Sequence, residues 1–228
     1  MPSALPVVPV LFFTTTTQAL ATLGILALAA VAPRAASELG ISAALIGYQV
    51  SLCFFGGMHT ALLGGGFVRR LGAARTSQLA LWLIAAGAAL SALGTVATLA
   101  AGALVMGWGY GITNPAASHL LSRAPTTGNM NLIFSIKQCG VPIGAMAAGM
   151  MMPTLTVLAG WRAALMACAI LAFAFSLSLQ PRRSAWDDDR DRAARLFVNP
   201  LASLRLIWAN KVLRWLAFCS FLYSAVQL

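Results

Sequence analysis

Charged side chains are scarce in this chain of 228 residues. Only 9% of the residues are charged, 60% are hydrophobic, and the mean hydropathy is +0.83. A soluble domain of this size carries about 25% charged residues, which cover its surface. Because too few charges are present to solvate a globule, we expect the lipid bilayer to be the solvent for much of the surface.

Other chemical groups are absent where particular functions would need them. The four cysteines, Cys53, Cys139, Cys168 and Cys219, fall inside apolar runs without metal-like spacing, so we expect buried, inert thiols and no metal site. No Lys or Arg precedes Arg34, which excludes the charged start of a secretory signal peptide.

Neither an enzyme nor a nucleic-acid-binding protein is expected. Ser118 and His119 are neighbours that would point about 100° apart on a helix, and no paired-carboxylate or metal constellation is visible, so we expect no catalytic site and no cofactor. The net charge of +10 could favour nucleic acid. However, the basic residues lie between long apolar runs and form no continuous face, so we expect no nucleic-acid partner.

The apolar runs predict membrane-crossing helices, each of which needs about 20 residues. No Asp, Glu, Lys or Arg occurs from Thr76 to Ser122. As one helix this stretch would be roughly 70 Å long, so it must cross a hydrocarbon core about 30 Å thick twice. We therefore predict six crossing helices, with Pro142 kinking the fifth, and the start of a seventh, at about 10–33, 42–66, 76–94, 98–122, 131–157, 161–180 and from 213 onward.

Three segments are predicted along the chain. Residues 1–181 form a six-helix transmembrane half, 182–209 a cytoplasmic linker, and 210–228 the partial seventh helix, so we expect a carboxy-terminal half to be missing. In the linker, the i,i+4 pairs Asp188/Arg192 and Asp191/Arg195 predict a solvated helical turn. An interfacial amphipathic helix is predicted next, with an apolar face of Leu201, Leu204, Ile207 and Trp208.

The arginines predict the orientation. With the amino terminus in the cytoplasm, only Arg34 and Arg162 lie in outer loops. The inner loops then hold ten: Arg69, Arg70, Arg75, Arg123, Arg182, Arg183, Arg190, Arg192, Arg195 and Arg205. This bias favours a cytoplasmic amino terminus.

The turn between the second and third predicted helices carries a family pattern. It contains Gly65, Arg69, Arg70, Gly72 and Arg75. This resembles the loop motif of the major facilitator superfamily, which reads Gly, three residues, Asp, a basic residue, any residue, Gly and further basic residues. Arg69 occupies the position of the Asp, which in the family helps to latch the two halves together. The resemblance therefore leaves that latch in doubt, and Arg69 is interpreted as a contact to lipid phosphate.

A longer resemblance covers three further stretches. Residues 107–115, 134–144 and 160–162 are similar to a bacterial branch of the same superfamily. The resemblance implies a multi-pass secondary transporter of the bacterial inner membrane, whose six-helix half consists of two inverted three-helix repeats. Small residues let helices approach closely in lipid, so we interpret five glycines as packing residues. They are Gly107, Gly109, Gly111, Gly140 and Gly144.

Lys137 is the only ionised side chain deep within a predicted crossing helix. An intramembrane Lys costs at least about 2.5–3.5 kcal/mol, so it is a functional candidate, although its long stem could also snorkel to the headgroups. Asn114 is equally distant from the loop that joins the fourth and fifth helices, which places it at the same depth. With Gln138, Tyr110 and Gln18, these residues form our candidate substrate site, although polar side chains can also simply join helices.

The expected function is transport of a small solute by alternating access. No Asp or Glu lies within a predicted crossing helix, so an acidic proton or sodium carrier is absent from this half, and a cavity whose only charge is positive suits an organic anion. Two alternatives stay open: a drug or solute efflux pump of the same superfamily, and a non-transporting membrane scaffold.

Overall fold

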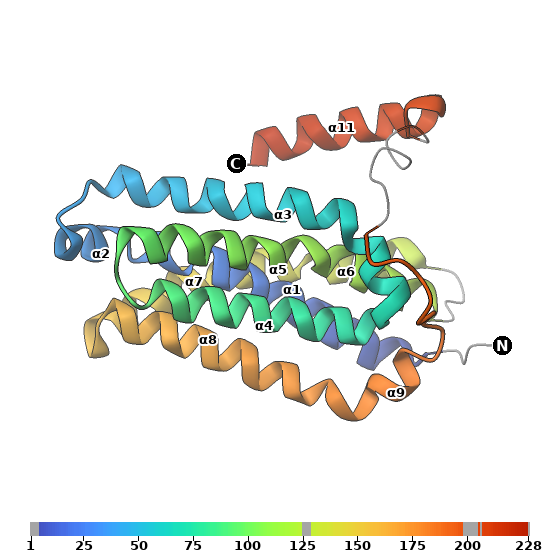
Figure 1. The fold of residues 1–228 in the computed structure, drawn as a ribbon, viewed down its shortest axis with the longest axis horizontal. Helices are drawn as coiled ribbons and strands as arrows, with labels where there is room; N and C mark the ends of the chain where they lie inside the picture. Colours follow the sequence, from blue (N-terminus) through green and yellow to red (C-terminus); the bar gives the residue numbers. More distant parts are fainter. Residues whose placement is uncertain (1–4, 125–128, 198–204, 206, 228) are drawn as a thin grey trace. The chain divides into compact units, whose positions relative to one another are not determined.

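The computed structural model describes residues 5–124, 129–197, 205 and 207–227. The chain divides into two compact units, Met1–Leu196 and Phe197–Leu228. In the first unit, six long helices form a bundle in which helices consecutive along the chain run in opposite directions (Figure 1): α1 (Val7–Ala30), α3 (Ala43–Leu71), α4 (Ala73–Ser91), α5 (Val96–Ser122), α7 (Gly140–Ala159) and α8 (Trp161–Ser178). Shorter pieces join them: α2 (Ala32–Leu39), α6 (Met130–Gln138), η1 (Gln180–Arg182) and α9 (Arg183–Trp186). In the second unit, α11 spans Lys211–Gln227.

The described helices match the predicted all-α membrane architecture. Five of them are long and apolar enough to cross a membrane: Val7–Ala30, Ala43–Leu71, Val96–Ser122, Met130–Ala159 and Trp161–Trp186. The remaining predicted crossing helix, at about 76–94, corresponds to α4, which is less apolar because its first two turns carry Arg75, Thr76, Ser77 and Gln78. Most of α4 is buried in the bundle, and Gln78 donates hydrogen bonds to the Ser176 carbonyl and to Gln180, at 3.0 and 3.1 Å.

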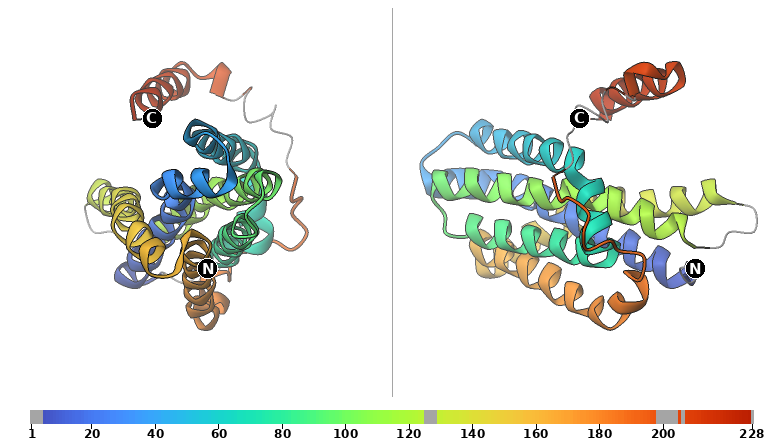
Figure 2. Two further views of the ribbon diagram at one scale, coloured as in Figure 1. Left: turned by 90° about the vertical axis from the view of Figure 1, so that its left-hand side faces the viewer. Right: turned by 45° about the vertical axis from the view of Figure 1, so that its right-hand side comes forward.

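The packing follows the two-repeat arrangement. The first repeat comprises α1, α3 and α4, and the second comprises α5, α6–α7 and α8. The first helix of each repeat packs against the second helix of the other, α1 against α7 and α5 against α3, as the view along the bundle shows (Figure 2). This exchange of partners is what two repeats of inverted topology produce.

Glycines stand at both of these helix contacts. A Cβ at Gly107 or Gly111 would collide with backbone of α3, and a Cβ at Gly140 or Gly144 with backbone of α1. The packing interpretation is thus confirmed for these four and for Gly109, which closely approaches the Ala80 carbonyl. Each pair has the i,i+4 spacing that lets two helix backbones meet in lipid.

The predicted kink near Pro142 is observed as an interruption between α6 and α7, at Cys139. Proline has no N–H to donate to the carbonyl one turn earlier, here that of Gln138, so the helical ladder is broken at this point. The thiol of Cys139 is exposed, as is that of Cys219, so the expectation of burial is wrong for these two and holds for Cys53 and Cys168. A membrane bundle presents much apolar surface to lipid, which is why an apolar run does not imply burial.

The segment after α9 packs against the bundle. Arg123, at the end of α5, pairs with Asp188 and Asp189, while the backbone N–H of Asp191 donates to the Arg69 carbonyl at 2.8 Å. Residues 187–197 form turns and irregular backbone, so the helical turn predicted over 188–195 is wrong. These tertiary contacts outweigh the weak i,i+4 pairing. Leu201 and Leu204 of the predicted amphipathic helix lie outside the described residues.

Candidate functional site

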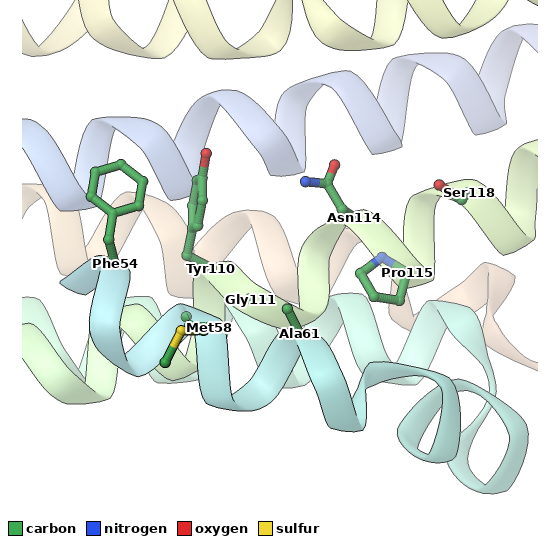
Figure 3. A pocket seen from close by; sticks show the side chains of 9 residues that line it. Phe54, Met58, Ala61, Tyr110, Gly111, Asn114, Pro115 and Ser118 are labelled. Carbon is green, nitrogen blue, oxygen red and sulfur yellow. The ribbon is translucent and has the colours of Figure 1, made fainter. Parts of the chain in front are cut away.

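A cavity of about 470 Å³ opens between α3 and α5. It is lined by Phe54, Gly57, Met58 and Ala61 of α3 and by Tyr110, Gly111, Asn114, Pro115 and Ser118 of α5. Figure 3 shows these side chains, with Tyr110 and Asn114 pointing towards α1. The spacing places them on one face of each helix, because residues i, i+4 and i+8 lie nearly above one another.

Lys137 reaches this cavity through Asn114. Its side chain projects from α6 and is only 3% exposed, and its ammonium donates a hydrogen bond to Oδ1 of Asn114. Asn114 itself is exposed at the cavity wall. The equal depth expected for these two residues is therefore observed, and the direct contact shows that the Lys137 ammonium is held inside the bundle by a neutral amide.

Gln18 joins this polar group from α1. It is buried, its Oε1 accepts from Thr113 at 3.4 Å, and its Cβ lies against Gly140, one turn beyond Lys137. Among the described residues, its Nε2 has no hydrogen-bond partner. Burying an amide donor without a partner costs about 1–3 kcal/mol.

The structure separates Gln138 from the other candidates. Gln138 is exposed, and as the neighbour of the buried Lys137 it lies about 100° further round α6. Conversely, sequence reasoning missed Phe54, Met58 and Ser118. The spacing of Phe54 and Met58 and that of Asn114 and Ser118 would have indicated a common helix face, but not which face lines a cavity.

The loop motif lies at one end of the bundle, away from the cavity. Gly72 adopts a φ of +91° between α3 and α4, a conformation that favours glycine. The carboxylate of Asp187 accepts hydrogen bonds from the backbone N–H groups of Ala74 and Arg75, at 2.7 and 3.1 Å. Burial raises the pKa of Asp187, against the lowering effect of these two N–H groups. Asp187 thus supplies a carboxylate to the start of α4 from more than 100 residues away.

At the opposite end, Glu38 joins α2 to α8. It accepts a hydrogen bond from the Trp161 indole at 2.6 Å and pairs with Arg162. Two hydrogen bonds lower the pKa of Glu38: the one from Arg162 has the larger effect, and the one from Trp161 has the next largest.

Two inverted repeats of three helices, with a partly polar cavity beside them, define one half of a membrane transporter fold. The family model of the Major Facilitator Superfamily matches residues 14–228, and the chain belongs to that superfamily. It is a multi-pass membrane protein.

Solved structures share the fold. The peptide transporter POT in complex with sulfate is 19% identical with a TM-score of 0.60, and the match covers 96% of this chain and 46% of that one. A mutant of POT in complex with alafosfalin is 20% identical with a TM-score of 0.63, and the match covers 93% of this chain and 45% of that one. The chain thus spans about half the length of these transporters. The comparison with curated proteins found no match.

Proposed function

We propose that the chain is the amino-terminal half of a secondary transporter that moves a small organic anion across the bacterial inner membrane by alternating access. The proposal places the amino terminus in the cytoplasm and the substrate between this half and a carboxy-terminal half. Family membership supports the transport activity. The single observation that supports an anionic substrate is the Lys137–Asn114 contact at the cavity wall.

The electrostatic argument depends on how the Lys137 charge is compensated. Asn114 provides a dipole but no negative charge, so this contact leaves the positive charge of the ammonium uncompensated within the bundle. Coulombic attraction is stronger there than in water, so an anion near Asn114 is stabilised. Gln18 and Tyr110 add hydrogen-bonding groups from α1 and α5, and Phe54 and Met58 supply apolar surface for an organic substrate.

The test uses the complete transporter, with uptake normalised to protein in the membrane. Lys137→Met keeps the apolar stem and removes the charge, so transport should fall by tenfold or more, since a charge-assisted contact is worth about 1.5–3 kcal/mol. Lys137→Arg should keep partial activity, because the charge remains although its shape differs. Lys211→Met, at the exposed start of α11, is the matched control and should transport as the unmodified protein does.

Two substitutions of Asn114 sharpen the test. Asn114→Ala should weaken transport about fivefold, less than Lys137→Met, because it removes an amide worth about 1 kcal/mol but keeps the Lys137 charge. Asn114→Asp should abolish transport of an anion, because the new carboxylate pairs with Lys137 and repels the substrate. Wild-type kinetics for Lys137→Met would remove Lys137 from the site and with it the case for an anion.

A further inference from the structure

Five arginines converge on one pocket at the α3–α4 end of the first unit. The pocket has a volume of about 270 Å³ and is lined by Arg70, Leu71, Arg75, Arg183, Arg190 and Arg192. These residues come from the end of α3, the start of α4, α9 and the irregular segment after it. The fold therefore assembles the pocket from segments separated by more than 100 residues.

The charges around the pocket are strongly unbalanced. The carboxylate of Asp187 lies beside pocket residues, but its oxygens already accept from the backbone of Ala74 and Arg75, with Arg183 Nε at 3.8 Å. Arg75 is repelled by Arg183, and the attraction of Asp187 offsets only part of this repulsion. Like charges held this close in a folded protein favour the binding of an anion.

The neighbouring acidic residues are directed elsewhere. Asp188 and Asp189 pair with Arg123 of α5, and Asp189 also contacts His119 at 2.6 Å. Asp191 accepts from the backbone N–H of Ala193 at 2.9 Å. The carboxylates of Asp187, Asp188 and Asp189 are thus directed towards α4 and α5, whereas Arg190 and Arg192 of the same segment line the pocket.

We infer that this pocket binds the phosphate headgroup of an anionic phospholipid. Guanidinium groups bind phosphate oxygens in pairs, and several arginines round a small cavity suit a group with three or four such oxygens. The pocket lies where α3 ends and α4 begins, and therefore at headgroup depth. With the orientation proposed above, it faces the cytoplasmic leaflet, whose anionic lipids bind basic pockets between helices. A volume of about 270 Å³ holds a headgroup, and the acyl chains would lie outside along the helices.

This inference concerns a lipid cofactor site and goes beyond transport. We expect the bound lipid to hold the segment after α9 against the α3–α4 turn. It would act in addition to the Asp187 carboxylate, which already joins this segment to the start of α4. Because five arginines contribute, binding should weaken as the salt concentration rises.

The test is a binding titration on the purified full chain in neutral detergent, by native mass spectrometry and thermal unfolding. The probes are phosphatidylglycerol, phosphatidylcholine, inorganic phosphate and ATP. Phosphatidylglycerol should bind and raise the melting temperature, whereas phosphatidylcholine should bind at least tenfold more weakly. Removing an arginine from the pocket should weaken phosphatidylglycerol binding by about tenfold.

The variants compare residues of the same segment. Two variants remove charge from the pocket: Arg192→Gln, and a double variant that combines Arg70→Gln with Arg192→Gln. The control, Arg195→Gln, removes the same charge from an exposed residue outside the pocket. Equal binding by the Arg192 and Arg195 variants, or equal binding of the two lipids, would overturn the inference. Tighter binding of phosphate or ATP than of phosphatidylglycerol would assign the pocket to a soluble phosphate compound instead. These measurements involve no transport, so they can fail or succeed independently of Lys137.

Discussion

Replacing Gly107 by alanine should force α3 and α5 apart. The new Cβ would meet the Cys53 carbonyl oxygen and lie 2.9 Å from its carbonyl carbon and 3.0 Å from its Cα. An unstrained carbon–carbon contact is about 3.5–4.0 Å, and the contact with the oxygen is tighter still, so the helices must separate by roughly 1 Å or more. All three atoms belong to the backbone, so no side-chain rotation can relieve the contact.

The magnitude follows from two opposing effects. Overpacking costs about 1–3 kcal/mol, and the upper part of this range applies because only backbone can move. Alanine in place of glycine within a helix gains about 1 kcal/mol. We therefore expect Gly107→Ala to lower the free energy of unfolding by about 1–2 kcal/mol.

A control in the same pair of helices isolates the contact. A Cβ at Gly47, in α3, would have no atom within 4 Å, so Gly47→Ala should gain the helix propensity alone. The two variants should differ by about 2–3 kcal/mol in the free energy of unfolding, measured by denaturant titration of the protein in detergent micelles. Gly111→Ala meets the Gly57 carbonyl, and combining it with Gly107→Ala should cost less than the sum, because one separation accommodates both methyl groups. Equal stability of the Gly107 and Gly47 variants would refute the reasoning.

Three further predictions concern the ends of the bundle. In a background without native cysteines, cysteines at the exposed positions Ser37 and Ala185 should react with an impermeant thiol reagent from opposite sides of the membrane; labelling from the same side would contradict the topology. Asp187→Ala should lower stability by about 1 kcal/mol, as loss of a helix cap does, and Asp187→Asn by less, because one acceptor remains. Glu38→Gln should lower the melting temperature at neutral pH. Because the pKa of Glu38 is lowered in the folded state, its pairing with Arg162 stabilises the fold above pH 4.5. The difference in melting temperature between the unmodified protein and Glu38→Gln should therefore vanish as the pH falls through the folded-state pKa of Glu38. A difference that persists at low pH would exclude an electrostatic origin.

The sequence was sufficient for the features that depend on local pattern. Apolar runs of about 20 residues can satisfy their backbone in lipid only as helices, so the crossing helices could be placed from composition alone. The short helix α2 was not predicted, because it lies in the stretch between two apolar runs that was expected to be a loop. The short loop between α5 and α6 sets a common depth for equally distant residues, which is why Lys137 and Asn114 could be paired in advance. The glycines at i,i+4 spacing likewise indicated close helix contacts before the partner helices were known.

Tertiary structure alone decided which faces of these helices meet and what the irregular segments contact. An apolar helix in lipid has weak amphipathic periodicity, so the sequence did not distinguish the cavity wall at Phe54 and Met58 from the lipid-facing surface. For the same reason it did not show that Gln138 is exposed while its neighbour Lys137 is buried. The Asp187 carboxylate reaches Ala74 across 113 residues, and the five-arginine pocket joins segments just as distant. Such contacts form because the bundle brings helix ends together, and no local spacing encodes which ends become neighbours.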